Sequence, residues 1–141
     1  MIYEPNQCPI RFGLGAFGDR WSLLIIRDMM FRGFCRFQDL LESGEGISTN
    51  VLSDRLRRLE AQQLISRKKD PANGRRVVYE LTGKGEDLLP VMLAIFAWAE
   101  KHDPQTHVSG ELAKRIRDES GAHSDEMSHI RHLITERLSG R

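Results

Sequence analysis

A chain of 141 residues, of which 40% are hydrophobic, is long enough for one compact core and too short for a complete dinucleotide-binding fold with a separate substrate domain. The longest apolar stretch, residues 88–99, contains a proline and is too short to span a bilayer. The N-terminus lacks the basic lead and apolar run of a signal peptide, and two cysteines without C-x-x-C spacing suit a reducing compartment. We therefore expect a cytoplasmic protein with no membrane partner and no structural zinc.

The charge is distributed unevenly, although the net value of +1 is small. Residues 48–78 contain 8 basic and 3 acidic side chains, which gives this segment a net charge of +5. The segments before and after it carry net charges of −1 and −3. A basic middle between neutral and acidic flanks is typical of a localised polyanion-binding surface. A solvated helix face followed by a charged hairpin explains the same distribution, so charge alone leaves both interpretations open.

Residues 19–31 and 36–43 are predicted to form two helices, separated by Gly33. Asp19 is a candidate N-cap for the first helix. The apolar face of that helix is expected to contain Trp21, Leu24, Ile25 and Met29. The second helix is expected to bury Phe37, Leu40 and Leu41. It should end at the sequence Gly-Glu-Gly, whose glycines permit a sharp turn.

A third helix is predicted over residues 48–63, with Ser48 as its N-cap. Leucines at positions i, i+4 and i+7 of this helix form a buried stripe, namely Leu52, Leu56 and Leu59. Two short helices joined by a glycine-containing turn, the second of them basic, form the helix-turn-helix arrangement. Many unrelated helical proteins contain such a pair, so the residues C-terminal to it decide the fold.

Two β-rich runs, residues 64–70 and 75–82, flank the sequence Pro-Ala-Asn-Gly. Proline and Asn-Gly between such runs predict a β-hairpin. The alternation of Val77, Tyr79 and Leu81 predicts that one face of the second strand is buried. A helix-turn-helix continued by a basic hairpin is a winged helix. We therefore expect a mainly α fold with a small β-hairpin wing, in the α+β class.

Gly13, Gly15 and Gly18 have the G-x-G-x-x-G spacing of a dinucleotide-binding loop. That function requires a buried strand before the glycines, and Pro5 and Pro9 interrupt the only residues available for it. The chain also shows no arrangement of a nucleophile with a base. We therefore expect no cofactor and no enzymatic activity, although a nucleotide-binding enzyme is kept as the third functional class.

From Cys8 to about Trp98 the sequence resembles the HxlR-type winged helix-turn-helix transcriptional regulators, relatives of the MarR group. The matching elements, in chain order, are CPI, GDRWSLLIIRDM, RFQDLLES, GISTNVLSDRLRRLE and VVYELTGKGEDLLPVM. The resemblance implies a sequence-specific regulator that binds double-stranded DNA as a homodimer held through terminal helices. A winged-helix module that binds protein is the second functional class, but the +5 segment contradicts the uncharged recognition face that it would need.

The chain departs from the family pattern at several positions. Where the family usually has Gly-Gly-Lys-Trp, this chain has Gly-Asp-Arg-Trp, so Gly18 is expected to be a hinge between two helices. Gln63 stands where the family tends to have glycine after the recognition helix, and a left-handed conformation there would cost about 1 kcal/mol, so either the helix ends differently or the core absorbs the strain. Arg76 and Val78 stand where members often have proline and glutamate, which makes the wing more basic.

The recognition helix can be oriented by its buried stripe. With Leu52 at the centre of the buried face, a rotation of 100° per residue places Asn50, Ser53 and Arg57 on the opposite side. These three are the candidates for base contacts, since asparagine pairs with adenine and arginine with guanine. The rest of the predicted DNA-binding set consists of Arg36, Ser48, Thr49, Arg55, Arg58, Lys68, Lys69, Asn73, Arg75 and Arg76. For any one of them, a solvated surface residue is the alternative.

Beyond the wing, Thr82 can cap a long helix over residues 83–102, with Pro90 tolerated only near its start or at a kink. Its apolar residues cover more than one face, so a partner subunit or the chain's own extension should cover part of it. We expect residues 1–102 to form the winged helix-turn-helix domain with a first dimerisation helix. Residues 103–141 should form a helical C-terminal extension, whose apolar stripe over 125–138 would extend the dimer interface.

Three histidines of the extension, His123, His129 and His132, weakly suggest a metal site, but no cysteine accompanies them and we expect no metal. Cys8 is a candidate redox sensor. In some members of the family the cysteine of the N-terminal Cys-Pro pair senses oxidants or electrophiles, and Cys8 occupies that place near the start of a helix. A small residue packed between the N-terminal arm and the body is the alternative. An unidentified small-molecule effector is a further candidate partner.

Overall fold

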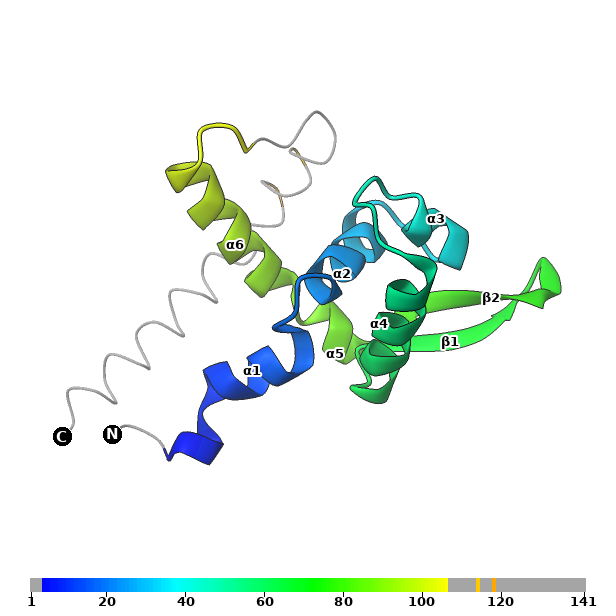
Figure 1. Ribbon diagram of the computed structural model, residues 1–141, viewed down its shortest axis with the longest axis horizontal. Coiled ribbons are helices and arrows are strands. Elements are labelled where there is room, and N and C mark those ends of the chain that lie inside the picture. The colour runs from blue at the N-terminus through cyan, green and yellow to red at the C-terminus, as the bar shows by residue number, and fades with distance from the viewer. Residues whose placement is uncertain (1–3, 107–113, 115–117, 119–141) are drawn as a thin grey trace. The chain divides into compact units, whose positions relative to one another are not determined.

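The computed structural model describes residues 4–106, 114 and 118. These residues contain a short 3-10 turn at Pro5–Gln7, six α-helices and a two-stranded antiparallel sheet (Figure 1). The helices are α1 (Pro9–Phe17), α2 (Ser22–Phe31), α3 (Phe37–Leu41), α4 (Thr49–Ala61), α5 (Gly83–Glu86) and α6 (Leu89–His102), and the strands are β1 (Ile65–Asp70) and β2 (Asn73–Leu81). The fold is thus mainly helical with a hairpin wing, as the sequence predicts.

The chain separates into two compact units, residues 5–88 and residues 1–4 with 89–141. The first unit contains the helix-turn-helix pair α3 and α4 together with the hairpin, which extends away from the helices (Figure 1). The second unit contains α6 among its described residues. The expected division into residues 1–102 and 103–141 stays a prediction.

Helix α4 is oriented by its leucine stripe. Leu52, Leu56 and Leu59 are at most 2% exposed, which confirms the predicted buried face. The hydroxyl of Ser48 accepts a hydrogen bond from the backbone N–H of Val51 at 3.2 Å, so Ser48 caps the helix as predicted. With the cap fixing its start and the leucines fixing its rotation, the outward face of α4 is determined.

Helix α2 begins three residues after the predicted start, at Ser22. Asp19 is therefore not the N-cap residue, a position that Trp21 occupies, but its carboxylate still accepts hydrogen bonds from the backbone N–H groups of Trp21 at 2.9 Å and Ser22 at 3.0 Å. The predicted apolar face was partly wrong. Ile25, Ile26, Met29 and Phe31 are buried, whereas Trp21 and Leu24 are only half-buried. Since the helix is covered on more than one side, a single-stripe pattern missed Ile26, which is fully buried.

The turns on either side of α3 are formed at glycines. Gly33 has a φ of 70° after the end of α2, and Gly44 and Gly46 also have positive φ values in the turn before α4. Helix α3 itself is shorter than predicted. Only Leu40 is buried among the three apolar residues expected on its inner side, and Phe37 and Leu41 are half-buried.

The hairpin turn differs from the prediction. Asp70 pairs with Asn73 across the turn, so Pro71 and Ala72 form the turn and Asn-Gly begins β2. The carboxylate of Asp70 accepts a hydrogen bond from the backbone N–H of Ala72 at 2.9 Å. The second position of such a turn favours proline, and Pro71 occupies it. These two preferences outweigh the Asn-Gly signal.

The predicted buried face of β2 was also wrong. Val78 is buried, whereas Val77, Tyr79 and Leu81 are half-buried. The register shifts between Lys69 and Asp70, where the pairing partner on β2 changes from Val77 to Asn73. Such an irregularity bends and twists the strand locally, so a strict alternation does not predict which side chain faces the core.

Of the two alternatives left open for Gln63, the structure has the left-handed conformation, with a φ of 60°. Its N–H donates to the carbonyl of Glu60 at 2.9 Å, and the N–H of Leu64 donates to the carbonyl of Leu59 at 3.0 Å. This pair of bonds is the Schellman motif, in which glycine normally occupies the left-handed position. Gly18 also has its predicted place between two helices, as the C-cap of α1.

The predicted long helix after the wing is two helices, α5 and α6. Thr82 caps α5 as expected, since its hydroxyl accepts from the N–H of Gly85 at 3.1 Å. Gly85 is buried against the carbonyl of Leu64, where a Cβ would overlap the oxygen. Pro90 is the second residue of α6 and cannot continue α5, because its ring would clash with the carbonyl of Glu86. No described helix combines the length and apolar character needed to cross a membrane.

We predict that replacing Gln63 by glycine raises the free energy of unfolding by about 1 kcal/mol, because glycine adopts positive φ without the steric cost that glutamine carries. Thermal or urea denaturation of the two proteins measures the difference. The matched control is Gln62→Gly, whose φ of −79° gives glycine no such advantage, so that variant should be less stable than the wild type. Equal stability losses in both variants would contradict the interpretation.

Candidate nucleic-acid interface

The outward face of α4 carries the residues that the helix rotation predicted for base contacts. Asn50 and Arg57 are exposed, and Ser53 is half-buried. Thr49, at the start of the helix, is exposed too. No ion pair of Arg57 is found among the described residues, so its guanidinium is available to an external acceptor. These side chains form a polar surface on the side of α4 opposite the leucines.

Arg55 lies between α4 and the start of α2. Its side chain is only 21% exposed, and its Nε atom is 3.5 Å from the carboxylate of Asp19. Burial raises the pKa of Asp19, but the hydroxyl and N–H of Ser22, the N–H of Trp21 and the charge of Arg55 together lower that pKa below its ordinary value. Arg55 therefore has an internal partner, which links the recognition helix to the start of α2. Sequence reasoning treated Asp19 only as a cap and missed this link, because nothing in the spacing pairs residues so far apart.

Arg58 is the more accessible arginine on this helix. Its side chain is 65% exposed and forms an ion pair with Asp54 one turn earlier, at 3.0 Å. An exposed pair of this kind contributes little to stability and exchanges readily for another anion. Arg58 can therefore contact an external phosphate at small cost.

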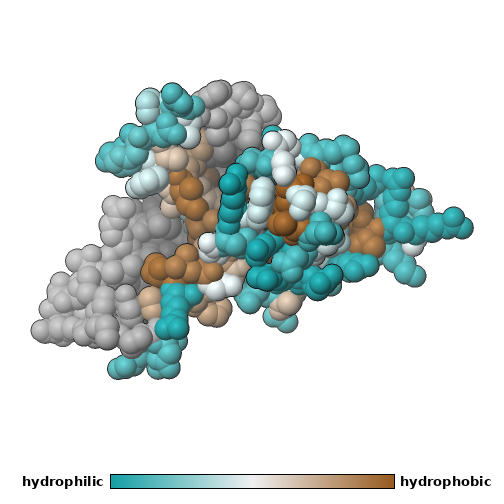
Figure 2. Space-filling model, in the orientation of Figure 1, coloured by the Kyte–Doolittle hydropathy of each residue, from teal (hydrophilic) through white to brown (hydrophobic). Residues whose placement is uncertain are grey.

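The wing presents a row of basic and polar side chains to solvent. Lys68, Lys69, Asn73, Arg75 and Arg76 are all exposed. Figure 2 shows hydrophilic residues covering the far end of the hairpin. Lys68 forms an exposed ion pair with Glu80 on the neighbouring strand. The carboxamide oxygen of Asn73 accepts from the N–H of Arg75 at 3.1 Å, which shapes the bulged start of β2.

Arg36, the residue before α3, connects the start of that helix to the wing. Its guanidinium is 2.6 Å from the carboxylate of Asp70, which is buried at the hairpin turn. The N–H of Ala72 lowers the pKa of Asp70, burial opposes this, and the nearby charges of Arg36 and Arg76 lower it further, so that it lies below its ordinary value. Asp70 thus accepts from the turn with one oxygen and from Arg36 with the other.

Sequence reasoning placed Arg36 against DNA phosphates and did not include Asp70. The Asp-Pro pair was a usable signal for Asp70 as a turn residue. Its partner lies 34 positions away in the sequence, so only the tertiary structure brings the two together. The side chain of Arg36 is still 43% exposed, and a contact of Arg36 with phosphate stays a prediction.

Cys8 is the N-cap residue of α1 and is half-buried. Its carbonyl accepts from the N–H of Phe12 at 3.0 Å, while its side chain makes no capping hydrogen bond. Cys8 and Cys35 are not joined in a disulfide. Cys8 thus stands directly before the first residue of a nine-residue helix, Pro9, which itself has no N–H group.

Within the part of the chain that the structure describes, no group of three or more histidine, cysteine, aspartate or glutamate side chains is arranged to hold a metal ion. The three histidines considered as weak metal candidates, at positions 123, 129 and 132, lie outside the described residues. The predicted dimerisation segment 125–138 lies outside them as well.

Residues 16–107 match the protein family described as HxlR-like helix-turn-helix. An uncharacterised HTH-type transcriptional regulator of Synechocystis, sll1512, is 38% identical over 88 residues, which are 62% of this chain and 64% of that protein. The chain therefore covers slightly less than two thirds of this relative's length. The HTH-type transcriptional regulator YodB of Bacillus subtilis is 35% identical over 97 residues, 68% of this chain and 86% of YodB.

Solved structures agree with these sequence matches. The crystal structure of PA1607 superimposes with a TM-score of 0.68 at 34% identity and covers 75% of both chains. The redox regulator HypR in its oxidised form has a TM-score of 0.60 at 28% identity, over 72% of this chain and all of HypR. YodB has been solved in a reduced and in a quinone-bound form. The winged-helix architecture is therefore shared with proteins of known structure.

Proposed function

The chain belongs to the HxlR-like helix-turn-helix family, whose relatives are HTH-type transcriptional regulators, and we propose that it binds inverted-repeat operator DNA as a homodimer. The observation that carries this proposal is the orientation of α4. Its leucines are buried, so Asn50 and Arg57 face outward on a helix that fits a major groove. The cytoplasmic location expected from the sequence follows from this role.

The proposed contacts divide between two elements. On α4, Asn50, Ser53 and Arg57 read base edges, while Thr49 and Arg58 bind phosphates near the ends of that face. On the wing, Arg75 and Arg76 at the far end of the hairpin bind backbone or the minor groove, because they lie on a different element from α4. The remaining members of the predicted set, Arg36, Ser48, Arg55, Lys68, Lys69 and Asn73, contribute phosphate contacts or hold these elements in place.

Exposed apolar side chains support the homodimer. Ile10, Phe12 and Leu14 on α1 are between 59% and 70% exposed, and Ile95 and Trp98 on α6 are 48% and 68% exposed. Apolar side chains concentrated on two helices exceed the scattered single exposures that a monomer usually shows. A second copy of the chain would cover them, in keeping with the terminal dimerisation helices that the sequence resemblance implies.

A response to electrophiles through Cys8 is the second part of the proposal. Cys8 stands at the start of α1, and α1 carries part of the surface that we assign to the dimer interface. Addition of its thiol to a quinone would form an S–C bond, transfer the thiol proton to the ring system and leave a hydroquinone thioether. YodB, a family relative, has been crystallised with a bound quinone, and HypR has been described as a redox regulator.

We predict that Arg57→Ala and Arg76→Ala impair DNA binding in different ways. Loss of a base contact by Arg57→Ala should cost about 1 to 3 kcal/mol on the operator and relax preference at one base pair per half-site. Loss of a phosphate contact by Arg76→Ala should weaken specific and random DNA equally and lower the salt slope by about one unit per contact. Mobility-shift titrations with the chain's own upstream DNA and random DNA measure both.

Arg11→Ala is the matched control, because it removes the same charge from an exposed position on α1 that is not among the proposed DNA contacts. It should change the affinity for either DNA only slightly. If Arg57→Ala weakens random DNA as much as the operator, then Arg57 contacts a phosphate and the assigned rotation of α4 is wrong.

The homodimer predicts a mass of twice 16.2 kDa in solution. Sedimentation equilibrium at micromolar concentration should show this species, and Phe12→Glu should shift it toward the monomer because a charge would be buried in the interface. The control Ala72→Glu introduces the same side chain at an exposed position of the hairpin turn, outside the surface assigned to the dimer. A stable monomer of the wild type at these concentrations would rule out the proposal.

For the response to electrophiles, we predict that p-benzoquinone changes the operator affinity of the wild type and of Cys35→Ser, but not that of Cys8→Ser. The reason is that the quinone adds to the Cys8 thiol in the proposal, and Cys35→Ser retains this thiol whereas Cys8→Ser lacks it. Mobility shifts before and after treatment measure the operator affinity, and mass spectrometry identifies the cysteine that carries the adduct. An equal response of Cys8→Ser and the wild type would show that Cys8 is not the sensor.

A further inference from the structure

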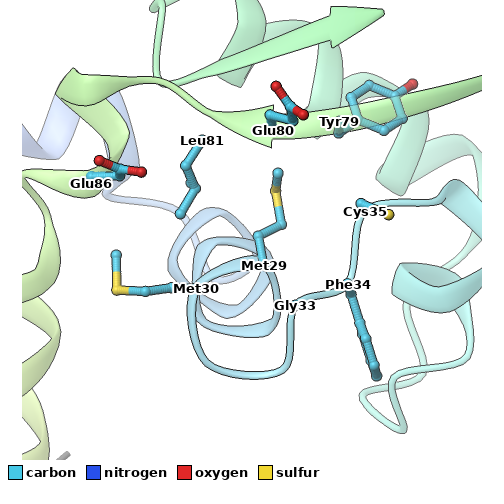
Figure 3. Close-up of a pocket in the computed structure, with 9 residues that line it drawn as sticks. All are labelled: Met29, Met30, Gly33, Phe34, Cys35, Tyr79, Glu80, Leu81 and Glu86. Carbon is cyan, nitrogen blue, oxygen red and sulfur yellow. The ribbon is translucent and has the colours of Figure 1, made fainter. Parts of the chain in front are cut away.

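A cavity of about 450 Å³ lies within the unit formed by residues 5–88, between α2, the loop after it, β2 and α5 (Figure 3). Its volume falls within the range of pockets that bind small organic molecules. None of its lining residues belongs to the predicted DNA-binding set or is Cys8. The proposed DNA contacts and the proposed sensor therefore leave this cavity unexplained.

The lining combines apolar and acidic side chains. Leu81 extends from β2 and Met29 from α2 into the space between these elements, and Met30 adds a second thioether from α2 (Figure 3). Methionine side chains are flexible and polarisable, so such a lining adapts to apolar groups of different shape. The charged residues of the lining are Glu80 and Glu86, and no basic side chain contributes to it.

The two carboxylates differ in their partners. Glu80 forms an ion pair with Lys68 on the neighbouring strand. Glu86 has no ion pair among the described residues, and the nearest lysine in the sequence, Lys84, donates instead to the carbonyl of Gln62 at 2.7 Å. Because, among the described residues, no basic side chain lines the cavity and Glu86 has no ion pair, an anion would be repelled by Glu86, whereas a cation would gain a carboxylate partner.

Two residues of the cavity lining also connect the wing to the helices. The N–H of Tyr79 on β2 donates to the carbonyl of Cys35 at 2.7 Å, which joins the strand to the loop after α2. The same strand contains Arg75 and Arg76 nearer the turn. A molecule held between α2 and β2 would therefore lie against the strand that continues into the wing.

We propose that this cavity is an effector site for a small organic cation with an apolar body, such as an arylalkylamine, with Glu86 as its counter-ion. Occupancy alters the affinity of the protein for DNA through β2. The regulatory half of this inference rests on the proposed function, whereas the binding half does not.

Methyl NMR of the full-length protein labelled with 13C at its methionine methyl groups tests the binding half without DNA. Phenethylamine should shift the signals of Met29 and Met30 saturably, while that of Met92, which does not line the cavity, should stay in place. The anion 3-phenylpropionate, similar in size, should bind at least about tenfold more weakly because its charge has the wrong sign. Signals are assigned with Met29→Leu and Met30→Leu.

Glu86→Gln should reduce the preference for the cation over the anion to about twofold. The matched control is Asp87→Asn, which removes the adjacent carboxylate outside the lining and should leave the preference unchanged. Absence of shifts at about 10 mM phenethylamine, a concentration that would fill even a site of millimolar affinity, would overturn the proposal. So would an equal effect of both variants, or equal binding of cation and anion.

A mobility-shift titration with saturating phenethylamine tests the regulatory half. A change in operator affinity that Glu86→Gln abolishes supports it, and unchanged affinity with the cavity filled overturns it. If the protein binds no DNA at all, the proposed function fails while the NMR result still decides whether the cavity binds the cation.

Discussion

The burial of three leucines on one side of α4 is the constraint on which the proposed interface depends. Leu52, Leu56 and Leu59 are removed from water, and because the helix is rigid, the positions on its opposite side are forced outward. Asn50 and Arg57 are exposed for this reason and not through any interaction of their own. The core of the unit and the surface proposed to contact DNA are therefore two consequences of the same packing.

Ion pairs then divide the basic residues into two groups. Arg55 and Arg36 face carboxylates at Asp19 and Asp70, so part of the positive charge is used to connect elements within the fold. The wing tip and the outer face of α4 keep the more exposed cations. The number of basic residues in a sequence segment is thus an upper limit for the number of cations that can bind DNA. The tertiary structure determines how much of it is already engaged inside the protein.

The wing is held at its base by backbone contacts. The left-handed turn at Gln63 ends α4, the N–H of Thr82 donates to the carbonyl of Leu64, and Gly85 is packed against that same carbonyl. These contacts connect the end of the recognition helix to the end of β2. The cavity beside β2 lies against the same strand, so a ligand there would contact an element whose other end carries Arg75 and Arg76.

The sequence alone determined the order of the helix-turn-helix pair and the hairpin, the caps at Ser48 and Thr82, and the leucine stripe. These features depend on local hydrogen bonds and helical periodicity, which act between residues a few positions apart. The break between α5 and α6 had its local signal in Pro90. Tertiary structure alone decided that Ile26 is fully buried, that Val78 rather than its neighbours faces the core, and that Arg36 pairs with Asp70. These outcomes depend on packing and charge between segments distant in the chain, and no spacing in the sequence records which segments will meet.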